Sequence, residues 1–229
     1  MNALTSPNQQ IGKWSAWTVF FIGVAFVLTG AAGLASTLRV AGRDPLEQID
    51  PYLAILESLM ILAAPAMVVL MAAVHSYAPR EVKTYSLAAL GFMLLLAGMT
   101  SSIHFVQLTV VRRLESADRP PLLLIFFSRW PSVLFALDLL AWDFFLGLSL
   151  LCAARVFSGS GSHKAVRVSL LLSGALCLAG LLGPTSGKLW LQLMGITGYA
   201  FVFPVACLLL ARLFAQPIGT GLEDGKDQF

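Results

Sequence analysis

The chain has 229 residues, of which 58% are hydrophobic and 12% charged, with a net charge of +3 and a mean hydropathy of +0.81. A soluble domain has about 45–50% apolar and about 25% charged residues, so this composition excludes a water-soluble fold. The charges lie almost entirely between apolar stretches, which indicates anchoring in a lipid bilayer and argues against a nucleic-acid partner.

Six apolar stretches are each long enough to cross the roughly 30 Å hydrocarbon core as a helix. They lie at 17–38, 53–75, 84–110, 132–156, 166–184 and 189–213. They are continuous and lack two-residue alternation, and a spanning backbone must satisfy its own hydrogen bonds, so we expect helices. The first stretch exceeds the 7–15 residues typical of a signal-peptide core, so it too is expected to span. The fold class predicted is an all-α bundle of six transmembrane helices.

The remaining segments divide the chain into three parts. We expect a polar N-terminal segment at 1–16, a transmembrane domain at 17–213 and a disordered polar tail at 214–229. Because successive spans alternate in direction, the two long connections, 39–52 and 111–131, emerge on one face, called here the loop face. The termini share the other face, called the terminal face.

The predicted location is the cell membrane, as a multi-pass protein. Of the 15 Lys and Arg residues, eight belong to the terminal face and seven to the loop face. Cytoplasmic loops carry the excess of positive charge, so this count favours, by one residue, termini in the cytoplasm. A homo-oligomer is compatible with only six helices.

Small residues and prolines inside the spans indicate close helix packing and local bends. Glycines in the first, fifth and sixth spans let backbones approach one another in lipid. Pro65 and Pro204 interrupt the second and sixth spans and are expected to kink them. The three cysteines, Cys152, Cys177 and Cys207, all lie within spans without CxxC spacing, which is typical of small core residues.

Few ionisable residues lie within the spans: Glu57, His75, His104, Asp138 and Asp143. A charge at membrane depth costs at least about 2.5–3.5 kcal/mol and normally faces the bundle interior, a cavity or a partner. Counting inward from the span ends places polar groups of four different spans roughly 6–14 Å below the loop face. These groups are Glu57, His104, Asp138 and Gln192. His75 lies at the opposite end of its span, where an interfacial position is expected.

Helical periodicity places several of these side chains on common faces. In the third span, Thr100, His104 and Gln107 share one stripe, with Ser101 beside it. In the fourth span, Asp138 shares a face with Trp142. In a regular α-helix, Asp143 would lie about 140° around from Asp138 and about 7.5 Å deeper.

The sequence therefore predicts a polar pocket near the loop face, covered by the 39–52 and 111–131 loops. Glu57 or Asp138 is the expected titrating group, with His104 as its partner or as a proton shuttle. The expected lining residues are Ser101, Gln107, Trp142, Asp143, Gln192 and Tyr199. Glu57, His104 and Asp138 are two carboxylates and an imidazole, but no paired histidines stand at ligand spacing, so no metal site is predicted. The sequence identifies no cofactor.

Three functions are compatible with this pocket. The first is binding, and also transport, of a small or lipophilic molecule. The second is an integral membrane enzyme in which a carboxylate and a histidine act as an acid-base pair on a lipophilic substrate. The third is a structural or assembly subunit whose buried polar residues only hold helices together, by contacts of a fraction of a kcal/mol to about 2 kcal/mol.

Overall fold

The computed structural model describes residues 6–39, 51–111, 125 and 131–216. Within these ranges the chain is helical and contains no strand. Six helical spans are long and apolar enough to cross a membrane, which confirms the predicted all-α bundle; they are Pro7–Ser36, Tyr52–Tyr77, Arg80–Thr109, Val133–Val156, Gly161–Ser186 and Leu189–Phe214. The chain is therefore a multi-pass membrane protein. Most of the two long loops and the tail from residue 217 onward lie outside the described residues.

The first three spans are nearly uninterrupted helices, whereas the last three are assembled from shorter pieces. The first group consists of α1 (Pro7–Arg39), α3 (Tyr52–Tyr77), η1 (Arg80–Val82) and α4 (Lys83–Thr109). The fourth span consists of α6 (Val133–Leu139), η3 (Leu140–Phe145), α7 (Leu146–Ala153) and η4 (Ala154–Val156). The fifth and sixth spans consist of α8 (Gly161–Gly180), α9 (Leu182–Ser186), η5 (Leu189–Leu191), α10 (Gln192–Ile196), η6 (Thr197–Val202) and α11 (Phe203–Phe214).

The first helix begins at Pro7, ten residues before the predicted start of the first span. Its start is a capping box: the Gln9 amide donates to Ser6 Oγ at 3.2 Å, and the Ser6 amide donates to Gln9 Oε1 at 3.0 Å. Pro7 occupies the first helical position, where its missing N–H costs nothing. Hydropathy alone gave the boundary at 17, because the residues before it are polar although they are helical.

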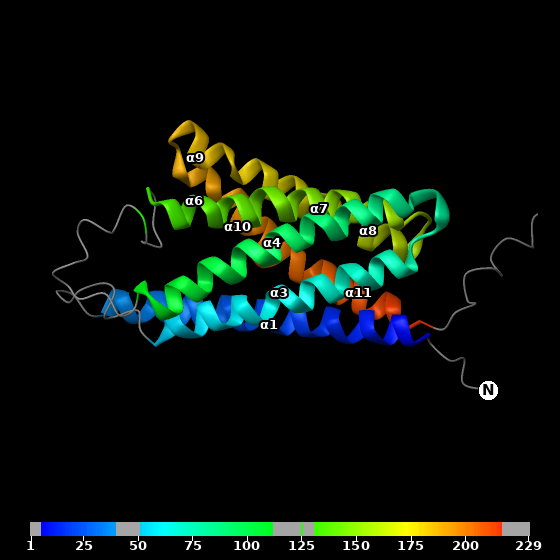
Figure 1. Cartoon of the computed structure of the whole chain (residues 1–229), viewed down its shortest axis with the longest axis horizontal. Helices are drawn as coiled ribbons and strands as arrows, with labels where there is room; N and C mark the ends of the chain where they lie inside the picture. Colours follow the sequence, from blue (N-terminus) through cyan, green and yellow to red (C-terminus); the bar gives the residue numbers. More distant parts are fainter. Residues whose placement is uncertain (1–5, 40–50, 112–124, 126–130, 217–229) are drawn as a thin grey trace, which may run out of the picture.

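The six spans form a closed ring in which sequence neighbours pack against each other and α1 packs against α11 (Figure 1). The beginning of α1 and the end of α11 lie at the same end of the bundle, where Gly12 fits against the Phe214 ring. α1 is the most peripheral span, since only 11% of its apolar window is buried, against 33–44% in the others. Its outward side chains therefore face lipid.

Two of the spans contain a π-helical segment. These are η3 in the fourth span and η6 in the sixth. Pro204 follows η6 and has no N–H to donate to the preceding turn, which accounts for a local change of helix type there. Ser173 Oγ of α8 donates to the Gly198 carbonyl of η6 at 2.9 Å. By contrast, α3 continues through Pro65 as one α-helix.

Glycines allow α8 and α10 to approach at backbone distance. A Cβ atom at Gly180 of α8 would lie 2.7 Å from the Gly195 Cα of α10. A Cβ atom at Gly195 would collide with Asp143 Oδ1 of η3. A side chain at Gly180 would therefore force α8 and α10 apart, and one at Gly195 would displace the Asp143 side chain. We call the contact of Gly180 with Gly195 the glycine seam.

Gly180→Ala is expected to lower the free energy of unfolding by about 1–3 kcal/mol, since the added methyl group collides with backbone atoms. Gly30→Ala is the matched control, because nothing lies within 4 Å of its added Cβ and Ala favours a helix by up to about 1 kcal/mol over Gly. Unfolding of the purified protein in detergent would compare the two. Equal stabilities would contradict the close approach at the glycine seam.

Candidate functional site

Three ionisable residues from three spans meet near the loop face. Glu57 lies five residues after the start of α3, His104 five residues before the end of α4, and Asp138 five residues after the start of α6. At 1.5 Å per residue, each lies about 7–8 Å along its helix from the end that faces the loops. The structure thus brings together the three residues that the sequence analysis selected as the acid-base group.

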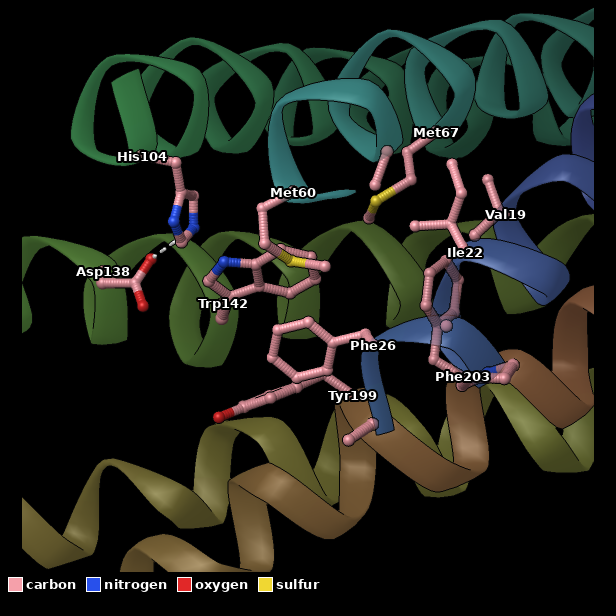
Figure 2. A pocket seen from close by; sticks show the side chains of 14 residues that line it. Val19, Ile22, Phe26, Met60, Met67, His104, Asp138, Trp142, Tyr199 and Phe203 are labelled. Carbon is pink, nitrogen blue, oxygen red and sulfur yellow. Dashed lines mark ion pairs between the residues drawn. The ribbon is translucent and has the colours of Figure 1, made fainter. Parts of the chain in front are cut away.

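His104 lies between the two carboxylates and uses a different ring nitrogen toward each. Its Nδ1 is hydrogen-bonded to Glu57 Oε2. Its Nε2 lies 3.5 Å from Asp138 Oδ1 (Figure 2). That separation is an electrostatic contact and too long for an ordinary hydrogen bond. The Nε2 atom is itself buried and has no hydrogen-bond partner in the described part of the chain. We call Glu57, His104 and Asp138 the carboxylate-imidazole cluster.

Exposure rises across this cluster toward Asp138. The side chains of Glu57 and His104 are 7% and 12% exposed, whereas that of Asp138 is 28% exposed. Glu57 thus acts as a buried support that fixes the imidazole through Nδ1. Asp138 is therefore the most exposed member of the cluster, although its Oδ1 and the facing His104 Nε2 are themselves buried.

A cavity of about 80 Å³ opens beside His104 and Asp138. Its wall is apolar apart from these two residues and the ring-bearing polar residues Trp142 and Tyr199 (Figure 2). The other lining residues come from α1, α3 and the sixth span and are Val19, Ile22, Gly23, Phe26, Met60, Ala63, Met67, Ala200, Phe203 and Pro204. The cavity therefore has room for more than a single water.

Trp142 connects the cavity to the polar stripe of α4. Its indole Nε1 donates to Thr100 Oγ1 at 2.9 Å, which satisfies a buried donor. The indole ring packs against the Tyr199 ring with 5.5 Å between centroids. Trp142 and Tyr199 come from the two π-helical segments, η3 and η6. Both predicted aromatic residues thus line the cavity.

Asp143 and Gln192 form a second polar cluster that does not line the cavity. Asp143 is completely buried, and its carboxylate lies against the glycine seam. The Gln192 amide lies near the Asp143 carboxylate and the Tyr199 hydroxyl. Within the described part of the chain, neither the Asp143 carboxylate oxygens nor the Gln192 amide atoms have a hydrogen-bond partner. The predicted angle between Asp138 and Asp143 assumed α-helical geometry, but residues 140–145 form a π-helix, whose wider turn changes that angle.

The remaining predicted polar residues lie near the site without lining the cavity. Gln107 is buried on the same face of α4 as Thr100, as the periodicity predicted, whereas Ser101 is half-buried beside that face. His75 lies at the other end of α3, where its Nδ1 is 2.8 Å from Ser86 Oγ of α4. His75 is therefore separated from His104 by most of the bundle and ties α3 to α4 near the terminal face.

A shallow groove on the outside of the bundle lies next to the cavity. It runs along α1 and the sixth span and shares Gly23, Ala200 and Pro204 with the cavity wall. Its other lining residues are Phe20, Val24, Val27, Leu28, Phe201 and Val205. These residues carry no charge, so we call this hollow the lipid-facing groove.

The carboxylate-imidazole cluster does not have the geometry of a metal centre. No group of three or more His, Cys, Asp or Glu in the described part of the chain is placed to hold a metal ion. The reason is visible in the cluster: Glu57 and Asp138 address different nitrogens of one ring. The two carboxylates therefore do not converge on a common point beside the imidazole.

Sequence reasoning missed the apolar wall of the cavity, especially the part supplied by α1. Val19, Ile22 and Phe26 belong to a span without an ionisable residue, and their spacing matches any lipid-embedded helix. The expected close packing at glycines of the first span does apply to Gly23, which in the structure faces Pro204 of α11.

The chain was also compared with known proteins. No protein-family model, no curated protein and no solved structure shows significant similarity to it. The site must therefore be interpreted from its own geometry.

Glu57→Gln is expected to destabilise the folded protein by about 1–3 kcal/mol, because it replaces a charged acceptor of a buried hydrogen bond by a neutral one. Asp138→Asn is expected to cost less, since Asp138 is more exposed and lies beyond hydrogen-bond distance of the ring. Unfolding in detergent would rank the two variants. Exposed Glu81 on the terminal face provides the control, Glu81→Gln. An equal or greater loss for Asp138→Asn would contradict the described geometry.

Proposed function

We propose that this membrane protein binds a lipophilic molecule in the cavity beside the carboxylate-imidazole cluster. The single observation that carries this proposal is the lining of the cavity: an apolar wall with His104 and Asp138 at one place on it. Small-molecule sites typically combine such a wall with a few convergent polar groups that fix the orientation of the ligand. Binding places the apolar part against the wall and the polar part at Nε2 of His104.

The composition of the wall supports a ligand that can adopt several shapes. Met60 and Met67 contribute unbranched, polarisable side chains that fit irregular apolar surfaces. Phe26 and Phe203 contribute flat surfaces. Transport is the natural extension of binding, because the cavity lies within the membrane and its cluster carries titratable groups, which mark pathways in membrane proteins.

The binding proposal can be tested with brominated hexanol, whose bromine quenches tryptophan fluorescence on contact. Trp142 is the reporter in a variant in which the other four tryptophans, Trp14, Trp17, Trp130 and Trp190, are changed to Phe. Quenching of this variant in lipid nanodiscs is expected to saturate with probe concentration, because the cavity is a limited number of sites. Fluorescence titration gives the dissociation constant.

Cavity-blocking variants provide the control for this titration. Ala63→Phe and Ala200→Phe each add a phenyl ring to a residue that lines the cavity, and either is expected to abolish the saturable phase. Ala31→Phe adds the same ring at an exposed position of α1 and is expected to leave it unchanged. Quenching that rises linearly, and equally in all variants, would mean that the probe only partitions into lipid and that the cavity does not bind it.

A second candidate function is an enzyme, and the arrangement around His104 favours it. A carboxylate that fixes Nδ1 while Nε2 faces a cavity is the arrangement of an oriented general acid or base. In that case Glu57 is a positioning residue, and His104 is the group that exchanges a proton with the substrate.

His104→Gln separates the two candidates. Mass spectrometry of the molecules retained by the purified wild type and by the variant is the measurement. An enzyme is expected to accumulate an unreacted molecule in the variant that the wild type does not hold. A binding protein is expected to retain the same molecule in both, in a smaller amount in the variant, and that result would exclude the enzyme.

A further inference from the structure

We infer that the ligand of this cavity is a lipophilic cation, such as an amine with an alkyl or aromatic body. This inference rests on the proposed function, because it names the ligand class of the same cavity. Three features of the described residues lead to it: the charge of the carboxylate-imidazole cluster, the absence of lysine and arginine from the cavity lining, and the aromatic rings beside Asp138.

The cluster carries more negative than positive charge. Two carboxylates share one imidazole, so even with the ring in its imidazolium form the ionised cluster has a net charge of −1. Glu57 holds the hydrogen bond to the ring, whereas Asp138 has only the 3.5 Å contact. The uncompensated negative charge is therefore at Asp138, which is the carboxylate that lines the cavity.

Among the described lining residues of the cavity, His104 can carry a positive charge, and it is already paired with two carboxylates. Neither lysine nor arginine is among the described lining residues. For α1, α4 and the sixth span, the described basic residues closest in sequence to the cavity-lining residues are Lys13, Lys83 and Arg212. All three lie near the terminal face. Among the described lining residues, a phosphate or carboxylate head group would therefore meet Asp138 without a lysine or arginine to compensate its charge, in surroundings that screen charge poorly.

The walls next to Asp138 are suited to a cation. The rings of Trp142 and Tyr199 line the cavity, and ring faces attract ammonium groups. An ammonium group at Asp138 would neutralise the cluster while its hydrocarbon body occupies the apolar wall formed by Met60, Met67 and Phe203.

Three probes with the same body and different head groups test this inference. They are brominated hexylamine, hexanol and hexanoate, which at neutral pH are cationic, neutral and anionic. Each is titrated against the variant that retains only Trp142, in nanodiscs of uncharged lipid. The amine is expected to bind about tenfold tighter than the alcohol, and the carboxylate more weakly than the alcohol.

Asp138→Asn tests the origin of the preference. It removes the charge and keeps the shape, so the amine and the alcohol are expected to bind with similar dissociation constants. Glu81→Gln removes one carboxylate from the terminal face and is expected to retain the tenfold preference. Thermal unfolding of both variants shows whether they are folded. If Asp138→Asn does not fold, the head-group order in the wild-type background, with Asp138 intact, decides the matter.

The outcomes separate this inference from the proposed function. Saturable quenching with equal affinity for amine and alcohol, or with tighter binding of the carboxylate, would overturn the cationic ligand and leave the binding cavity intact. The cationic ligand would also be overturned if Asp138→Asn folds and keeps the preference for the amine. Absence of saturable quenching with all three probes would overturn the binding cavity itself.

Discussion

The arrangement of the bundle near the loop face depends on the hydrogen bond between Glu57 and His104. Burying a carboxylate or an imidazole alone among helices in lipid costs free energy. The hydrogen bond between Glu57 and His104 lowers that cost, because each group gains a partner. The bond joins α3 to α4 and sets the direction of the imidazole ring. The position of the unpartnered Nε2 beside Asp138, which distinguishes the cavity from a packing defect, follows from that fixed orientation.

The second half of the bundle is organised differently, around backbone contacts. The glycine seam brings α8 against α10, and the buried Asp143 carboxylate lies against it. The two π-helical segments carry Trp142 and Tyr199, which separate this second polar cluster from the cavity. Tyr199 lines the cavity and also lies near Gln192, so it stands between the two polar regions.

The sequence allowed the fold class and the central cluster to be predicted, for simple physical reasons. Membrane spans must be long, apolar and helical, so counting residues locates them. Charges in lipid need partners, and depth along alternating spans indicated that Glu57, His104 and Asp138 would meet. The predicted start of α1 was too late, because a capping box consists of polar residues and hydropathy detects only apolar ones.

Other features could not be obtained by counting. The π-helical turn at residues 140–145 changes the direction of Asp143, and regular periodicity does not foresee it. Gln192 has the predicted depth but lies near Asp143 and Tyr199, since depth gives no information on the direction around the bundle. The apolar wall of the cavity could not be predicted for a more general reason. In a membrane protein, apolar side chains face both the lipid and the bundle interior, so the sequence does not distinguish Val19 and Phe26 from lipid-facing residues.

The lipid-facing groove shares Gly23, Ala200 and Pro204 with the cavity, so a wall one residue thick separates the binding space from the hydrocarbon of the bilayer. If the cavity binds a lipophilic ligand as proposed, the relevant reservoir for that ligand is the membrane and not the water. Its occupancy of the site would follow its partition coefficient, and a molecule scarce in the aqueous phase would still reach a high local concentration beside α1. Two ligands with equal affinity for the cavity would thus compete according to how well each dissolves in lipid.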